Sequence, residues 1–157
     1  MSRAELESFR DFIFNTIAVL VGALDDLDEA GLNWRPPAPA TNSLYAIVAH
    51  VLGNAEENLL GTLCGRPHER DYPGEWVATG KDADALRARW ALLRERFDAA
   101  FAALPAGELD RERTHPRRGM LTGREVLIVV ARHAAEHWGE AQLTKSLLNA
   151  TKGQRDE

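Results

Sequence analysis

The chain has 157 residues, of which 45% are hydrophobic and 27% charged, with a formal net charge of -5. This length suits one domain, residues 1–157, with its own core, and the scattered basic residues argue against a nucleic-acid surface. No apolar run approaches the ~20 residues that a membrane-spanning helix needs, and we see no signal peptide. The single cysteine, Cys64, excludes an intramolecular disulfide and is typical of a reducing cytoplasm. We therefore expect a single-domain cytoplasmic protein.

Apolar residues spaced three and four apart recur in four segments of the chain, a pattern typical of amphipathic helices. We expect these helices at about residues 3–28, 43–64, 82–104 and 122–148. Ser2 and Glu5 form a capping box at the start of the first helix, and Asn42 or Ser43 caps the second. The third helix carries the cleanest apolar stripe and ends at Pro105, which cannot continue a helix.

The segments between the predicted helices differ in length and composition. Residues 65–80 hold prolines, glycines and mixed charge without a period, which predicts a long crossover between the second and third helices. An arginine-rich loop then leads to the fourth helix, where Thr122 and Glu125 form a second capping box. No segment shows the alternation of a β-strand. The sequence therefore predicts an all-α four-helix bundle, in which metal sites form between facing helices.

Two histidines lie four residues apart in the fourth predicted helix, inside an otherwise apolar run. His133 and His137 therefore share one helical face, and on a helical wheel this buried stripe also includes Glu140. A third histidine, His50, lies in the second helix beside small residues, with Glu57 two turns further on. Three helix-borne imidazoles predict a metal site with open coordination positions, as in catalytic metal centres. Hydrogen-bonded core histidines are the alternative.

The other reactive side chains are expected to be structural. His68 and His115 lie in loops among arginines and prolines, so we expect exposed polar residues. Cys64 is interpreted as a small buried hydrophobic residue, with a nucleophile or a ligand as the alternative. Arg117 and Arg118 could meet an anionic substrate at the mouth of the site, although a solvated loop is the preferred interpretation.

Three stretches of the chain resemble the DinB-like superfamily, which includes bacillithiol transferases and mycothiol-dependent maleylpyruvate isomerases. These stretches are Leu32–Pro37, Asn42–His50 and His133–Leu143. The resemblance implies an up-down-down-up bundle whose members often dimerise. It also implies that His50, His133 and His137 bind a divalent metal ion, zinc or nickel in the first place, with manganese or iron as alternatives.

The resemblance further implies a reaction class, the metal-assisted attack of a low-molecular-weight thiol on a small electrophile. Our hypothesis is a metal-dependent thiol S-transferase in which Glu140 or Glu57 orients a ligand histidine or accepts a proton. Its partners would be a small-molecule substrate and the thiol, without nucleic acid or membrane, and the chain would form a homodimer. The alternatives are a non-catalytic metal-binding stress or interaction protein and a metal-free bundle with structural histidines.

Overall fold

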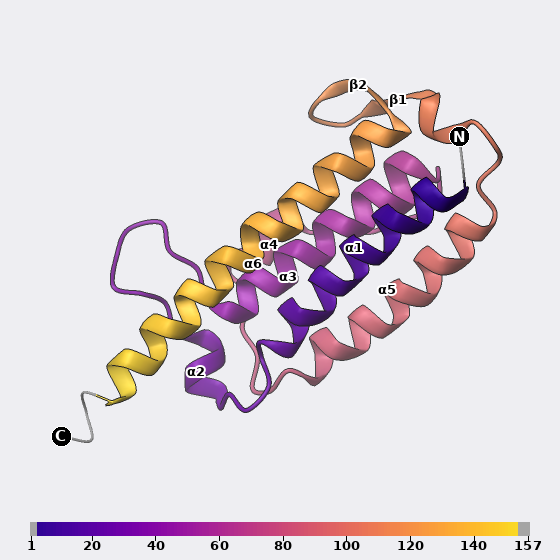
Figure 1. Ribbon diagram of the computed structural model, residues 1–157. Coiled ribbons are helices and arrows are strands. Elements are labelled where there is room, and N and C mark those ends of the chain that lie inside the picture. The colour runs from indigo at the N-terminus through magenta and orange to yellow at the C-terminus, as the bar shows by residue number, and fades with distance from the viewer. Residues whose placement is uncertain (1–2, 154–157) are drawn as a thin grey trace.

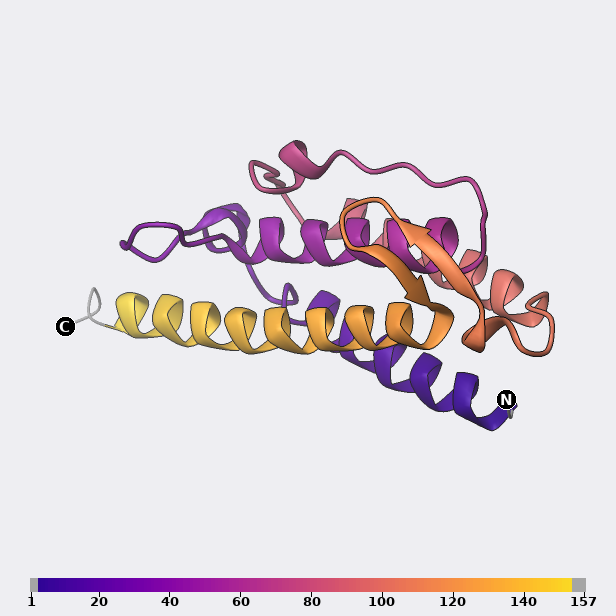
Figure 2. The ribbon, with the colours of Figure 1, turned by 90° about the horizontal axis from the view of Figure 1, so that it is seen from above.

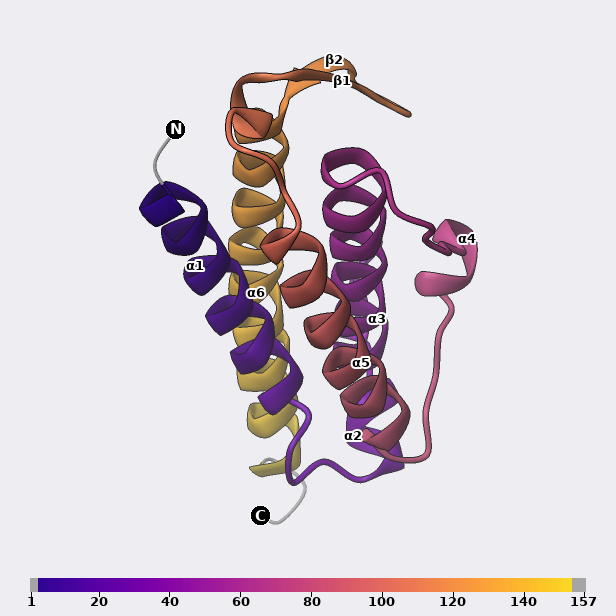
Figure 3. The ribbon, with the colours of Figure 1, turned by 90° about the vertical axis from the view of Figure 1, so that its right-hand side faces the viewer.

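The computed structural model describes residues 3–153, most of which are helical (Figure 1). The long helices are α1 (Arg3–Gly22), α3 (Leu44–Ala55) with its π-helical continuation η1 (Glu56–Leu63), α5 (Asp84–Ala102) and α6 (Gly123–Gly153). The short elements are α2 (Glu29–Asn33), α4 (Tyr72–Glu75), the 3-10 helix η2 (Glu108–Asp110) and the strands β1 (Glu112–His115) and β2 (Gly119–Thr122). In Figures 1 and 3, α1 and α6 run in one direction, whereas α3 and α5 run in the opposite direction.

The core lies between the four long helices. Helix α6 packs on α1 and on α3 with η1, and α5 covers the other side of the same elements. An aromatic cluster joins α1 to α5, with the ring of Phe14 5.6 Å from that of Trp90 and 5.9 Å from that of Phe97. Phe97 is fully buried, and burying such a side chain stabilises the fold by about 1.5–3 kcal/mol. No helix among residues 3–153 is both long enough and apolar enough to cross a bilayer.

Two of the predicted helix caps are present. The Ser43 hydroxyl oxygen accepts a hydrogen bond from the backbone N–H of Ala46 at 3.2 Å, so Ser43 is the N-cap of α3. At the start of α6, the Glu125 carboxylate accepts from the Thr122 N–H at 2.7 Å, and the Glu125 N–H donates to the Thr122 hydroxyl at 3.2 Å. This reciprocal pair is the predicted capping box. The capping box predicted at Ser2 lies outside the described residues.

The first helix is shorter than predicted. Helix α1 ends at Gly22 instead of about residue 28, and Asp26 adopts the left-handed conformation with φ 63°. The Asp28 carboxylate then accepts from the Gly31 N–H at 2.9 Å and caps the separate helix α2. Aspartate side chains compete with helical hydrogen bonds and favour caps and turns, so they end the helix here. Leu24 beyond the helix end remains buried, which is why the apolar period continues past it.

A β-hairpin replaces the arginine-rich loop, where the sequence showed no strand. Strands β1 and β2 pair antiparallel, with His115 opposite Gly119, and Gly119 takes the positive φ of +74° that this tight turn needs. Each strand has only four residues, and the less exposed residues of β1 are the polar Arg113 and His115, so no alternation of apolar and polar residues marks a strand in the sequence. Strand β1 contacts η1 and β2 contacts α6, so the hairpin bridges these two helices (Figure 2).

The second long helix changes its winding halfway. Its predicted range corresponds to α3 followed by the π-helix η1, in which the Cys64 N–H donates to the Leu59 carbonyl five residues earlier at 3.2 Å. This wider turn buries the consecutive polar residues Glu56, Glu57 and Asn58. Single π-helical turns often occur at functional sites, because they re-aim side chains that an α-helix would point to solvent. Here they point at partners on α5, the crossover and the hairpin.

Candidate metal centre

Three histidines meet between α3 and α6. The two helices pack in opposite directions, and this brings His50 on α3 against His133 and His137 on α6. The Nε2 atoms of His50 and His133 lie 2.9 Å apart, and the ring centre of His137 is 4.9 Å from His50 and 4.5 Å from His133. One ring nitrogen of each residue lies within 4.8 Å of the other two. The histidine cluster predicted from the sequence is therefore present.

Carboxylates orient two of the three rings. The Nδ1 atom of His50 lies 2.9 Å from Oε2 of Glu75, and Nδ1 of His137 lies 2.7 Å from Oε2 of Glu140. An ionised carboxylate only accepts hydrogen bonds, so each Nδ1 is the donor, and in a neutral imidazole Nε2 then keeps the lone pair that can bind a metal ion. Histidines that bind metals commonly donate their second ring N–H to a carboxylate in this way. The donor set of this cluster therefore fits a divalent metal ion.

Burial keeps two of the three imidazoles, those of His50 and His133, neutral. Burial lowers the pKa of His50, and burial together with the neighbouring histidines lowers the pKa of His133 to about 2. A hydrogen bond from His137 lowers the pKa of the Glu140 carboxyl, which also accepts from the Asn42 amide at 3.1 Å. At neutral pH, His50 and His133 thus present unprotonated nitrogens, and the Glu140 carboxylate nearby is ionised. Metal ions need this protonation state, because they bind imidazole only in its neutral form.

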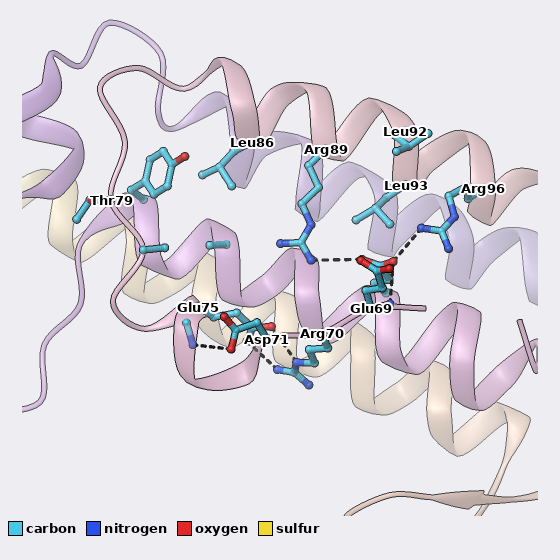
Figure 4. A pocket seen from close by; sticks show the side chains of 15 residues that line it. Glu69, Arg70, Asp71, Glu75, Thr79, Leu86, Arg89, Leu92, Leu93 and Arg96 are labelled. Atoms are coloured by element: carbon cyan, nitrogen blue, oxygen red, sulfur yellow. Dashed lines mark hydrogen bonds and ion pairs between the residues drawn. The ribbon is translucent and has the colours of Figure 1, made fainter. Parts of the chain in front are cut away.

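Glu75 reaches His50 from the crossover, residues 64–83, by passing close to α3. A Cβ atom at Gly53 would lie 1.8 Å from Oε1 of Glu75, so only glycine leaves room for the carboxylate. The Arg70 guanidinium holds both oxygens of Glu75, at 2.9 and 3.0 Å (Figure 4). The side chains of Arg70 and Glu75 are each only 4% exposed. Such a bidentate, buried pair fixes the position of the carboxylate and, through it, the ring of His50.

Aromatic residues of the same crossover cover the cluster. The Trp76 ring stacks on His50, with 3.8 Å between ring centres and 28° between planes. The Tyr72 ring lies edge-on to His50 at 5.8 Å. Sequence reasoning missed Arg70, Glu75 and both aromatic rings, because the segment has no periodicity. The only available signal was the concentration of charged and aromatic residues inside a loop.

The two candidate glutamates lie in different places. Glu140 contacts His137 directly, whereas Glu57 does not contact the cluster. Glu57 instead pairs with Arg70 at 2.8 Å and with Arg117 of the hairpin. Burial alone would raise the pKa of the Glu57 carboxyl, but hydrogen bonds from Arg117 and Arg70 outweigh it and lower that pKa. Glu57 therefore reaches His50 only through Arg70 and Glu75.

The structure confirms the prediction for His68 and corrects the prediction for His115. His68 is exposed, as predicted, but His115 is buried, with 3% exposure. Its ring contacts Oδ1 of Asn58 at 2.9 Å and accepts the backbone N–H of Arg117 at 3.0 Å. A loop prediction could not foresee this burial, because it depends on the hairpin packing on η1. Cys64 is half-buried, and burial raises the pKa of its thiol to about 11, which makes it a poor nucleophile at neutral pH.

A pocket of about 750 Å³ lies between α5 and the crossover (Figure 4). Arg70 and Glu75 line it, but none of the three histidines does. Five of its charged side chains are paired: the buried Glu56 carboxylate binds Arg89 at 3.3 Å and Arg96 at 2.8 Å, and Arg70 binds Glu75 at 2.9 Å. The pocket therefore shares its wall with the histidine cluster without contributing a ligand to it.

The fold and the cluster define a class of protein: a helical bundle with a three-histidine centre between two of its helices. Residues 15–141 match the family model of the DinB superfamily. Because this match covers most of the chain, the protein belongs to the DinB superfamily, whose members include metal-dependent enzymes. No curated protein matches the chain significantly.

Proposed function

We propose that this protein is a divalent-metal-dependent thiol S-transferase. The observation that carries the proposal is the convergence of three imidazoles, two of which contact a carboxylate through Nδ1. Three protein ligands leave coordination positions open, as catalytic metal sites require. Membership of a superfamily that includes metal-dependent enzymes also supports a metal-dependent function. His50, His133 and His137 would be the metal ligands.

The protein's own residues would orient and protect the reacting groups. A bound divalent ion supplies Lewis acidity, which lowers the pKa of a coordinated thiol into the neutral range. Glu75 and Glu140 hold the rings of His50 and His137 through Nδ1, so that Nε2 of each ring would be the atom that binds the ion. Trp76 and Tyr72 restrict water on one side of His50.

The thiol would lose its proton to solvent. The low pKa of Glu140 makes it a weak base, so it acts by positioning His137. The sulfur electron pair forms the new C–S bond, and the pair of the broken bond departs with the leaving group.

The finer assignments of fold and assembly belong to the same proposal. The helix directions in Figures 1 and 3 support an up-down-down-up bundle with the crossover between its second and third helices. A homodimer, zinc or nickel as the ion, and a low-molecular-weight thiol as co-substrate follow from the resemblance to the superfamily. They are expectations for solution measurements.

Elemental analysis of tag-free protein tests the site. After reconstitution with zinc or nickel, the wild-type protein should hold close to one ion per chain, and His133→Ala should hold far less. His68→Ala is the matched control, because it removes an exposed imidazole outside the cluster. Equal metal content in His133→Ala and wild type would contradict the proposed ligands. A metal-loaded protein without turnover on any thiol–electrophile pair would favour a non-catalytic metal-binding protein.

A further inference from the structure

A second pocket, of about 540 Å³, lies between the loop that follows α2 and the residue that follows α4. Two of its lining residues connect it to the histidine cluster. The Trp76 ring stacks on His50, and its centre lies 6.1 Å from that of the His137 ring. The Asn42 amide donates to Glu140, which itself contacts His137. The pocket therefore adjoins the proposed metal site.

The loop between α2 and α3, which forms most of this pocket, is fixed by its own hydrogen bonds. The Thr41 hydroxyl, a single donor, is shared between the carbonyls of Pro36 and Ala38, at 2.8 and 3.0 Å. Ala40 adopts the left-handed conformation with φ 58°, which persists in a residue other than glycine only where the surrounding structure holds it. The wall is therefore preformed, and a ligand that binds here does not have to order the loop.

Arg35 is held in the wall of the pocket without an acidic partner. Its guanidinium donates to the backbone carbonyls of Thr41 at 3.2 Å and of Trp76 at 2.5 Å. These carbonyls fix its position but carry no charge, and Arg35 forms no ion pair with any residue in the described part of the chain. A guanidinium has five N–H donors, of which Arg35 uses two here, so three remain for a ligand.

The lining of the pocket combines this positive charge with an apolar surface. Of the described residues that line it, Arg35 alone is charged. The others are two prolines, two alanines, Thr41, Asn42 and Trp76. A guanidinium without a counter-charge attracts anions, and its planar shape matches a carboxylate. The proline and indole rings offer apolar contacts to a carbon skeleton. The lining therefore matches a small organic acid.

We propose that this pocket is the substrate subsite of the neighbouring histidine cluster and that it takes a small organic carboxylate. Arg35 binds the carboxylate, and Trp76 with the prolines contacts the carbon skeleton. Because Trp76 also stacks on His50, a ligand in the pocket lies against the residue that covers the cluster. This inference rests on the proposed function, since it names the chemical class of that enzyme's substrate.

Calorimetric titration with phenylacetate tests the subsite without turnover, in metal-free and in metal-loaded protein. Phenylacetamide is the uncharged analogue, and acetate lacks the apolar body. Phenylacetate should bind both forms of the protein, about tenfold or more tightly than phenylacetamide, because hydrogen bonds to charged groups are the stronger ones. It should also bind more tightly than acetate, and more weakly at high salt.

Arg35→Gln separates ligand binding from a structural role. Glutamine keeps an N–H donor for one carbonyl of the loop but removes the charge, so phenylacetate should bind about tenfold or more weakly. Phenylacetamide should bind as it does to wild type. If Arg35 only tied the loop to the end of α4, both probes would lose affinity equally. Arg94→Gln is the matched control, because it removes an exposed charge from α5, outside the pocket.

The subsite is wrong if wild type does not bind phenylacetate or binds phenylacetamide as tightly. It is also wrong if Arg35→Gln binds phenylacetate as tightly as wild type does, or loses affinity for both probes equally. Phenylacetate binding that requires the metal and is insensitive to Arg35→Gln would mean that the carboxylate binds the ion directly. The metal content of Arg35→Gln should equal that of wild type. Failure of the subsite is therefore distinguishable from failure of the metal site, which elemental analysis of His133→Ala reports.

Discussion

The helices and the irregular segments of this protein make different contributions to one site. Helices α3 and α6 supply the three imidazoles from regular, mostly apolar surfaces, and the packing of the bundle brings them together. The crossover supplies a buried ion pair that orients His50 and aromatic rings that cover it, and the hairpin adds the ion pair between Arg117 and Glu57. The ligands therefore depend on the stability of the bundle, whereas their alignment depends on a few polar contacts.

This comparison predicts the largest effect on stability in the bundle core. Phe97→Ala should lower the free energy of unfolding by about 3–5 kcal/mol, because it removes a fully buried ring from the aromatic cluster. Urea denaturation of metal-free protein measures this change. Leu92→Ala on the same helix, where the side chain is 56% exposed, should change stability by about 0.5 kcal/mol or less. A similar loss in both variants would show that the aromatic cluster has no special role.

The crossover should affect metal affinity more than folding. Glu75→Gln removes the charge that orients His50, so the affinity for the divalent ion should fall by about 10–100-fold. Competition with a chelating dye measures this affinity on reconstituted protein. Gly53→Ala should weaken binding in the same direction, because the added methyl displaces Glu75.

Glu136→Gln is the matched control for the crossover. It removes an exposed carboxylate that pairs with Arg132 on α6, one residue before His137. Its metal affinity should equal that of wild type. If Glu75→Gln also binds the ion as tightly as wild type, the crossover does not align the site.

The hairpin should give a smaller, pH-dependent effect. Burial, followed by the charges of Arg117 and Arg118, lowers the pKa of His115. The unfolded chain titrates near pH 6.5, so below that pH it binds more protons than the folded protein. The contribution of His115 to stability is therefore complete above pH 6.5 and is lost as the pH falls.

His115→Gln isolates this contribution. Between pH 7.5 and 5, the stability of metal-free wild type should fall more steeply than that of the variant, by up to about 1.4 kcal/mol per pH unit. Urea denaturation across this range gives both slopes. Parallel slopes would mean that His115 titrates in the folded protein as it does in the unfolded chain.

The predictable parts of the fold are those that depend on residues close together in the sequence. The period of apolar residues located the long helices, and the Thr122–Glu125 box marked the start of α6. The same period failed at the end of α1, because Leu24 stays buried after the backbone has left the helix. It also could not detect the hairpin, whose strands are four residues long and whose less exposed residues in β1 are polar.

The sequence by itself determined the ligand candidates, because the spacing of His133 and His137 places both imidazoles on one helical face. The neighbouring Glu140 follows from the same helical geometry. Only the tertiary structure decided that Glu75 orients His50 and that His115 is buried. It also decided that Glu57 forms its ion pairs with Arg70 and Arg117. These contacts join residues 13 to 60 positions apart through aperiodic segments. Their partners depend on where the crossover and the hairpin pack, which no local pattern of residues specifies.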